Sequence, residues 1–130
     1  MVFDTSAIIA ILRNEPEAGA LEKTLVGDRV RAVAATCVLE ARMVLVSRRG
    51  EHALAELDLW LAKIGADIVP VDADLVDLAT QAWLAYGKGR HRAGLNFADC
   101  ISYALAKRSR QPLLFKGQDF SQTDIPAAYS

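Results

Sequence analysis

Residues 2–7 read VFDTSA, an apolar pair followed by a carboxylate, two hydroxyl side chains and alanine. The apolar pair predicts a short buried strand, and Thr5 or Ser6 is suited to cap a helix that continues through Leu12. Asp4 therefore falls where a strand ends and a helix begins. A buried charge without a partner is costly, so the carboxylate of Asp4 needs a partner. Asp4 is therefore either a helix cap, bonded to backbone N–H groups, or part of a site.

Strand and helix signals alternate along the rest of the chain. We expect strands at 30–34, 67–71 and 113–115, helices at about 16–26, 36–47 (capped by Thr36), 51–64, 74–86 and 96–107, and a short terminal element near Ile125. Short apolar strands that alternate with helices indicate a parallel sheet covered on both faces. The sequence thus predicts one domain over residues 1–130, an α/β protein with three α/β/α layers and a short, mainly parallel central sheet. In such sheets the functional site lies beyond the carboxyl ends of the strands.

Two further acids interrupt apolar helical segments. Glu40 follows Val38 and Leu39, and its carboxylate either faces solvent or belongs to a site. Asp99 stands three residues after Asn96 in a capping-box pattern, where the helix dipole stabilises an anion without any metal. Together with Asp4, at the ends or inside of apolar segments, they favour one shared site over three separate roles. Acids that meet at one point repel one another, so such a site would also hold a cation. Oxygen ligands of this kind suit Mg²⁺ or Mn²⁺.

Composition indicates a folded protein. Hydrophobic residues make up 52% and charged residues 24% of the 130 residues, which is unlike a disordered chain. No apolar stretch approaches the roughly 20 residues of a membrane span, and the N-terminus lacks the layout of a signal peptide, so we expect a cytoplasmic location. Cys37 and Cys100 lie in apolar helical settings and are expected to be buried hydrophobes. Trp60 and Trp83 are predicted to lie in the core or in a dimer interface.

The net charge of −1 conceals an uneven distribution. Between residues 88 and 116, one acid, Asp99, faces seven basic residues: Lys88, Arg90, Arg92, Lys107, Arg108, Arg110 and Lys116. This asymmetry is compatible with a polyanionic partner, although a basic run also serves simply as a solvated face.

Several segments, taken in order, resemble a known family. They are VFDTSA at 2–7, Glu40, GLNFADC at 94–100, YALA at 103–106 and FKGQDF at 115–120. Over essentially the whole chain they are similar to PIN-domain proteins, and specifically to VapC-type toxin ribonucleases of bacterial type II toxin–antitoxin systems. One small departure is Ala98, which stands where the family commonly has glycine before the third acid.

The resemblance implies a metal-dependent endoribonuclease that cleaves structured cellular RNA, either tRNA or rRNA. Asp4, Glu40 and Asp99 would hold Mg²⁺ or Mn²⁺, which activates a water, with Asp119 as a weaker fourth candidate. The supporting residues would be Thr5 and Ser6, bonded to a carboxylate or a metal-bound water, and Asn96. The RNA backbone would follow Lys88, Arg90, Arg92 and Lys116.

The resemblance also implies partners. One is a small VapB-type antitoxin whose C-terminal tail blocks the site. A homodimer is expected as well, because the segments near 51–64 and 74–86 carry more large apolar residues than one small core needs. With the antitoxin, a larger hetero-oligomer is expected.

Two other functions compete with this interpretation. A haloacid-dehalogenase-like phosphatase also begins with an aspartate after the first strand, but it needs a second aspartate where this chain has Ser6. The alternative that stays open is a catalytically silent PIN-like module that binds RNA or protein.

Overall fold

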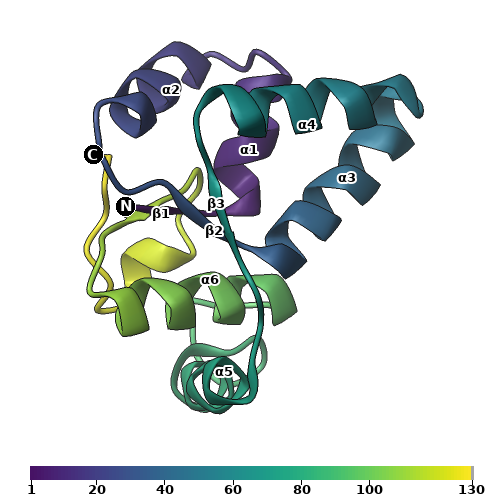
Figure 1. The fold of residues 1–130 in the computed structure, drawn as a ribbon. Coiled ribbons are helices and arrows are strands. Elements are labelled where there is room, and N and C mark those ends of the chain that lie inside the picture. Colours follow the sequence, from purple (N-terminus) through teal and green to yellow (C-terminus); the bar gives the residue numbers. More distant parts are fainter. Residues whose placement is uncertain (130) are drawn as a thin grey trace.

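Four short strands form one parallel sheet in the order β3-β2-β1-β4 (Figure 1). The computed structural model describes residues 1–129. Its strands are β1 (Val2–Phe3), β2 (Ala32–Ala34), β3 (Asp67–Val69) and β4 (Leu113–Leu114). The pairing register aligns Val2 with both Ala32 and Leu113, so β1 lies between β2 and β4 in the sheet.

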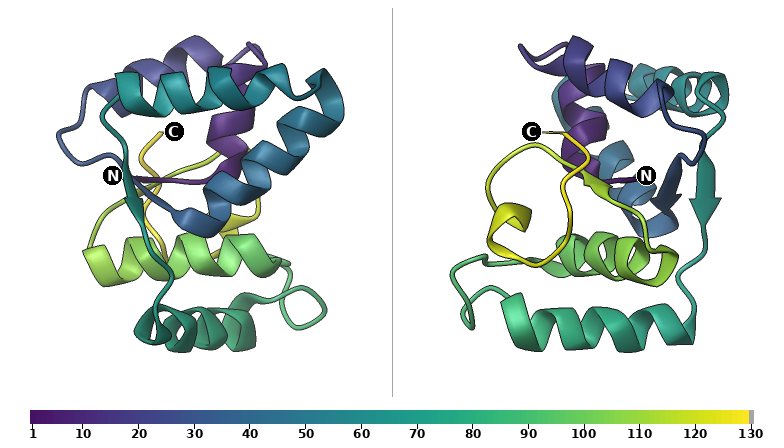
Figure 2. Two further views of the ribbon diagram at one scale, coloured as in Figure 1. Left: turned by 45° about the vertical axis from the view of Figure 1, so that its right-hand side comes forward. Right: turned by 90° about the vertical axis from the view of Figure 1, so that its left-hand side faces the viewer.

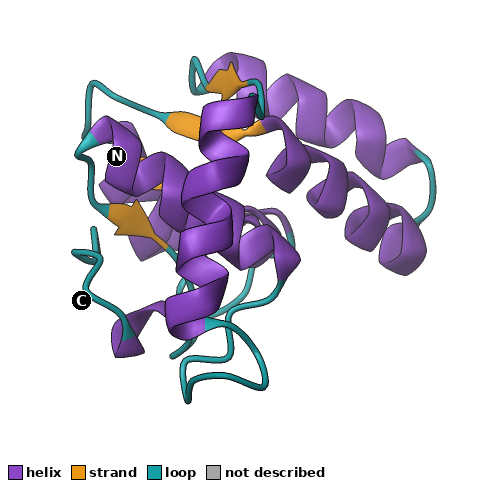
Figure 3. Cartoon of the chain, turned by 90° about the horizontal axis from the view of Figure 1, so that it is seen from below, coloured by secondary structure: helices purple, strands orange, loops and turns teal. Residues whose placement is uncertain are grey.

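Helices cover both faces of this sheet (Figure 2). They are α1 (Thr5–Leu12), α2 (Ala18–Val26), α3 (Ala35–Arg49), α4 (His52–Lys63), α5 (Ala73–Tyr86) and α6 (Phe97–Ser109), with a 3₁₀ turn at Phe120–Gln122. The helices α1 to α4 lie on one side and α6 lies on the other, where α5 packs mainly against the outer side of α6. The α3–α4 hairpin projects to one side of the sheet (Figure 3, right). No described helix is long and apolar enough to cross a membrane.

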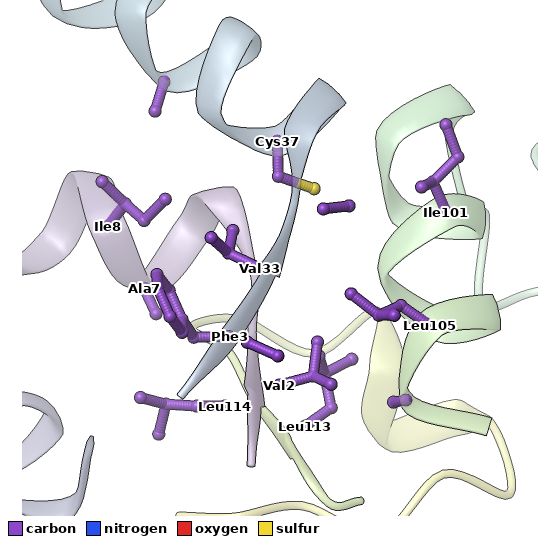
Figure 4. Packing of buried hydrophobic residues seen from close by; sticks show 14 of the residues in the cluster. Val2, Phe3, Ala7, Ile8, Val33, Cys37, Ile101, Leu105, Leu113 and Leu114 are labelled. Atoms are coloured by element: carbon purple, nitrogen blue, oxygen red, sulfur yellow. The ribbon is translucent and has the colours of Figure 1, made fainter. Parts of the chain in front are cut away.

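The core lies on both sides of β1 (Figure 4). Phe3 and Ile8 are fully buried on the side of α1, and Leu105 of α6 is buried on the other side. Full burial of one such side chain contributes about 1.5–3 kcal/mol. Residues 100–106 of α6 are buried without interruption, because this helix lies between the sheet and α5. The predicted three-layer fold with a short parallel sheet is confirmed.

Local details differ from the sequence-based expectations, mostly at caps. Asp4 itself is the N-cap of α1, and its carboxylate accepts the Ser6 backbone N–H, so neither Thr5 nor Ser6 caps this helix. Thr36 is not a cap either, because α3 already begins at Ala35 and has no side-chain cap.

Strand limits and the C-terminal segment also differ from expectation. β2 begins at Ala32 rather than Val30, and β3 ends at Val69 rather than Val71. The expected element near Ile125 is a single bridge between Ala127 and Leu113, which covers the outer edge of β4. Trp60 packs in the core edge-on to Phe3, as expected.

Parallel pairing brings the carboxyl ends of all four strands to one edge of the sheet. Asp4 follows β1 directly, α3 follows β2, and the segment 115–119 follows β4. The N-terminus of α6 lies close to this edge, because Ser102 of α6 donates a hydrogen bond to Asp4. The fold therefore delivers the predicted acids from four separate segments to one region.

Candidate active site

Asp4 is a buried carboxylate, with 3% of the residue exposed. Its Oδ2 accepts the Ser6 backbone N–H at 3.0 Å, and its Oδ1 accepts the hydroxyl hydrogen of Ser102 at 2.6 Å. Both donors are neutral, and within residues 1–129 no Lys, Arg or His forms an ion pair with Asp4. The fold orients this anion without neutralising it, which is costly unless a cation joins it.

Ser102 belongs to a buried chain of hydrogen bonds that the sequence analysis missed. Its single hydroxyl hydrogen goes to Asp4, so the Cys37 thiol, with Sγ 3.0 Å from Ser102 Oγ, donates to Ser102. Figure 4 shows the Cys37 sulfur directed from α3 toward α6. Burial, and secondly the charge of Asp4, raise the pKa of this thiol to about 11, which keeps it a donor. One signal was present: Ser102 is a polar residue in an apolar run, three positions after Asp99 and on the same helix face.

Asp99 is a helix cap and a member of the acidic cluster at once. The Asn96 side chain accepts the Asp99 N–H at 2.9 Å, and Asp99 Oδ2 accepts the Asn96 N–H at 3.0 Å, so the predicted capping box is present. The pKa of Asp99 is nevertheless raised to about 7. Burial is the main cause, and the charges of Asp4, Asp119 and Glu40 add to it against the opposing Asn96 bond. The favourable helix N-terminus therefore does not offset what burial and the neighbouring acids cost the ionised carboxylate.

Glu40 and Asp119 complete the cluster from two other segments. Glu40 is partly buried on α3, and Asp119 is exposed just before the 3₁₀ turn. Both are near enough to raise the pKa of Asp99 electrostatically. Among the described residues neither one makes an ion pair with a basic side chain. The structure thus brings all four predicted acids to one end of the molecule.

The donor set fits a hard divalent cation, although its oxygens have not converged on one point. The four acids offer only carboxylate oxygens, the ligands that Mg²⁺ and Mn²⁺ prefer. Within residues 1–129, no three His, Cys, Asp or Glu side chains stand close enough together to hold a metal as they are. Asp4 and Asp99 already direct oxygens toward neutral donors of the protein. To share one cation, the acids would have to adjust their side-chain rotamers.

Thr5 and Ser6 support the site differently from expectation. The Thr5 hydroxyl donates to the Cys37 backbone carbonyl at 3.3 Å, which ties the start of α1 to α3. The Ser6 hydroxyl accepts the Lys116 backbone N–H at 3.0 Å, which ties α1 to the segment after β4. The hydroxyl that reaches a carboxylate of the cluster is that of Ser102. Thr5 and Ser6 therefore hold together the elements that carry the acids.

The predicted basic residues fall into two environments. Lys88, Arg90 and Arg92 are exposed in the loop that joins α5 to α6. The ammonium of Lys116 instead forms ion pairs with Glu15 and with Glu17, the latter at 3.2 Å, and these bonds raise the pKa of the lysine. A phosphate would have to compete with both glutamates for Lys116. The loop is therefore the more accessible surface for a polyanion.

Comparison with known proteins fits this arrangement of acids. A family model described as PIN domain matches residues 1–126. The chain is 54% identical over 129 residues to a protein named Ribonuclease VapC from Mycolicibacterium smegmatis, covering 99% of this chain and 100% of that protein. The chain belongs to the PIN domain family. This PIN domain is also 52% identical over 125 residues to Ribonuclease VapC30 of Mycobacterium tuberculosis, covering 96% and 95% of the two chains. Its place among the VapC-type toxin ribonucleases is thereby confirmed.

Solved structures share the fold at low sequence identity. VapC20 of Mycobacterium tuberculosis, described as a sarcin-ricin loop cleaving toxin, superposes with a TM-score of 0.76 at 19% identity, covering 96% of each chain. A chain of a toxin–antitoxin complex from Klebsiella pneumoniae gives a TM-score of 0.71 at 18% identity, covering 99% of this chain and 98% of that one. These likenesses confirm the PIN-type architecture.

Proposed function

We propose that this PIN domain is a Mg²⁺- or Mn²⁺-dependent endoribonuclease that acts as a toxin on structured cellular RNA, either tRNA or rRNA. The observation that carries the proposal is the cluster of four acids without a basic counter-charge among the described residues. Its clearest sign is the pKa of about 7 at Asp99. Acids that are desolvated and uncompensated in this way are typical of functional sites.

Three of the acids share one task in this proposal, and Glu40 has a second. Asp4, Glu40 and Asp99 would hold the cation, with Asp119 beside them. When bound, the cation supplies Lewis-acid activation of a water and offsets charge at the scissile phosphate. No hydrogen bond or ion pair holds the Glu40 side chain within residues 1–129, so this carboxylate is free to take the proton of the attacking water. The water oxygen then bonds to phosphorus while the bond from phosphorus to the leaving nucleotide's oxygen breaks.

The loop with Lys88, Arg90 and Arg92 would follow the RNA backbone. All three side chains are exposed, and phosphate contacts of this kind make binding fall with rising salt. Lys116 would contribute only after exchanging its two glutamate partners for a phosphate.

An antitoxin of the VapB type would control the site. Membership among VapC-type toxins and the fold shared with a chain of a toxin–antitoxin complex support this proposal. A basic side chain on the antitoxin's C-terminal tail would replace the charge of the metal among Asp4, Glu40 and Asp99. Arg90 and Arg92 would meanwhile hold acidic residues of the tail. A hetero-oligomer of toxin and antitoxin follows.

A homodimer is proposed as well, and exposed apolar side chains lie on α3 in addition to the two helices expected. On α4 the large side chains Leu57, Trp60 and Leu61 are buried in the chain's own core, but Leu59 of α4 is 71% exposed and Leu84 of α5 is 52% exposed. The α3 side chains Leu39 and Met43 are also 57% and 62% exposed, on the hairpin that projects from the sheet. A second copy would cover them. Sedimentation velocity at micromolar concentration should give a dimer, and a monomer would count against this part.

Cleavage-site mapping on total cellular RNA tests the central proposal. Induced expression of the wild-type chain should produce new RNA ends and arrest growth, whereas the Asp4→Asn chain should do neither. The purified protein should lose cleavage in excess EDTA and recover it with Mg²⁺ or Mn²⁺. A protein that binds metal and RNA yet cleaves nothing would instead be the silent module, and full activity in EDTA would remove the metal from the mechanism.

A further inference from the structure

An apolar cavity of about 280 Å³ is lined in part by residues of α3 and α6, the two helices that carry Glu40 and Asp99. The segment after β3 and the helices α3, α5 and α6 form it, and its walls include Thr36, Val76, Ala79, Trp83, Phe97 and Ile101. Ligand sites are typically apolar hollows with very few polar groups. This one has no task in the chemistry described so far.

The cavity shares its supporting elements with the proposed catalytic residues. Thr36 lies four residues before Glu40 on α3, so the two share one helix face. Phe97 and Cys100 flank Asp99 in the first turn of α6. The cavity is therefore built on the same two helices that carry Glu40 and Asp99.

Phe97 presents an aromatic face at the mouth of the cavity. The residue is 78% exposed, although it is the first residue of a helix whose start the capping box fixes. An exposed aromatic ring on a fixed backbone is stabilised when another flat ring stacks on it and removes it from water. All nucleobases stack on aromatic side chains in this way, whichever base is present. Phe97 contributes little to the core, so its exposure is explained better by a ligand than by folding.

Trp83 forms a fixed wall with a cation over one face of its ring. A Cβ on Gly87 would come within 2.4 Å of Trp83 Cδ1, so only glycine at position 87 permits this placement of the indole. The guanidinium of Arg90 lies 4.9 Å from the centre of the Trp83 ring. The apolar cavity thus has a positive rim on one side, which complements a ligand that joins a flat apolar ring to a phosphate.

Thr36 supplies a polar group at the cavity wall that lacks a partner. Its Oγ1 is buried and makes no hydrogen bond among the described residues. Rotation about the Cα–Cβ bond exchanges this hydroxyl with the methyl group, and a ligand with a polar edge would provide the missing partner. An unsatisfied buried hydroxyl is unfavourable, so ligand binding would relieve an existing cost.

We propose that this cavity binds one nucleobase of the RNA, next to the phosphodiester that is cut. The base stacks on Phe97 against the wall formed by Trp83, and the Thr36 hydroxyl bonds to its edge. Arg90 contacts the neighbouring phosphate. This inference rests on the proposed nuclease function and adds base selection to it. At about 280 Å³ the cavity lies just below the range of about 300–1,000 Å³ that is typical of sites for whole small ligands, which fits a single base.

The test compares RNA with and without bases. The full chain, carrying Asp4→Asn to prevent cleavage, is titrated into two fluorescein-labelled octamers, a mixed-sequence oligoribonucleotide and an abasic strand of the same length. Phe97→Ala should weaken binding of the first roughly tenfold and leave the second unchanged, because only stacking is lost. Leu84→Ala is the matched control, since Leu84 is 52% exposed on the same helix as Trp83 but outside the cavity; it should change neither affinity.

A second variant probes the edge of the base. Thr36→Val keeps the shape of the side chain and removes the hydroxyl, so it should reduce the differences in affinity among A, C, G and U homo-oligomers. The abasic strand should be unaffected. Unchanged preferences would overturn the role of Thr36.

Other outcomes would overturn the proposal as a whole. These are equal losses for both octamers, no loss, no binding of either octamer, or a Phe97→Ala protein that sediments as a monomer where the parent is a dimer. In the last case a second copy occupies the cavity. Cleavage by the wild-type chain is measured in parallel. If the protein cleaves RNA and Phe97→Ala leaves kcat/KM unchanged, the nuclease function holds and the base site is wrong. If binding depends on the bases but no cleavage occurs, the base site holds and the nuclease function is wrong.

Discussion

The two ends of α6 treat acidic residues in opposite ways. At the C-terminal end, Asp124 accepts hydrogen bonds from Lys107, at 2.7 Å, and from the Tyr103 hydroxyl. At the N-terminal end, Asp99 meets only further acids and its own helix cap. One end of α6 thus contacts an acid that is paired for stability, and the other end carries an acid that no basic side chain of the described residues neutralises. The second kind marks the place where a cation has to come from outside the chain.

The pKa values of the two acids express this contrast. The Lys107 ammonium, and secondly the Tyr103 hydroxyl, hold the pKa of Asp124 below its ordinary value. Burial and neighbouring acids instead raise the pKa of Asp99 to about 7. Rising pH therefore stabilises the native structure through Asp124 and destabilises it through Asp99. A perturbed pKa is informative about function here because of its direction and its cause.

The largest expected effect separates the two ends by activity. Asp99→Asn should lower the rate of RNA cleavage by roughly 1000-fold, because it removes a proposed metal ligand. Asp124→Asn should leave the rate within about twofold, because that carboxylate only braces the far end of α6. Initial rates on one RNA substrate at saturating Mg²⁺ check both variants, and circular dichroism controls for folding. Equal losses of cleavage rate in the two variants would mean that removing either negative charge near α6 has the same effect, whatever the position of the acid.

Ser102→Ala tests how far the support of Asp4 matters. The change leaves Asp4 Oδ1 and the Cys37 thiol without their partner, and it should destabilise the protein by about 1.5–3 kcal/mol, as for a buried hydrogen bond to a charged group. The affinity for Mg²⁺ should fall roughly tenfold, since Asp4 loses its orientation. Urea denaturation and calorimetry measure the two effects. Thr24→Ala removes a hydroxyl bonded only within α2 and is the matched control. Unaltered metal affinity together with lost stability would make Ser102 a purely structural residue.

A pH series on the metal-free protein tests the raised pKa of Asp99. Between the unfolded value of about 4 and the folded value of about 7, the native state binds more protons than the unfolded state, so stability falls as pH rises. The loss from pH 5 to pH 8 should be about 1–2 kcal/mol after allowance for solvent screening.

Two comparisons isolate the cause of that loss. The Asp99→Asn protein should show a smaller decline with pH than the parent. Added Mg²⁺ should restore much of the parent's stability at pH 8 and have less effect on the variant, because it binds the native state. A parent whose stability rises steadily from pH 5 to pH 8 would contradict the raised pKa.

The sequence was informative where local chemistry decides the structure. The strand at Val2–Phe3 and the capping box of Asn96 and Asp99 follow from residue type and spacing alone, and both are present. The cap at Asp4 was one of the two roles expected for that residue, whereas the cap at Ala34 was missed in favour of Thr36, because parallel pairing sets where β2 ends.

Contacts across the fold could not be derived from spacing. Ser102 reaches Asp4 over 98 residues, and Cys37 reaches Ser102 over 65, so only the packed structure reveals this chain of hydrogen bonds. Trp83 could not be placed either, since its position depends on the bare backbone of Gly87 and on Arg90. The acids of the site were predictable from their types, whereas the groups that orient them were not.

The smallest expected effect belongs to the paired end of α6. Lys107→Ala should cost at most about 1 kcal/mol, because both partners of the ion pair with Asp124 are roughly half exposed and solvent screens it. The sign with pH is opposite to that at Asp99: the stabilisation is present above the unfolded pKa of about 4 and is lost as the pH falls through the lower folded value. Thermal melts at pH 7 should shift down by roughly 1–4 °C, and those at pH 3 by less. A larger loss at pH 3 than at pH 7 would show that the Lys107 side chain acts through packing, and the contrast between the two ends of α6 would then not be one of charge.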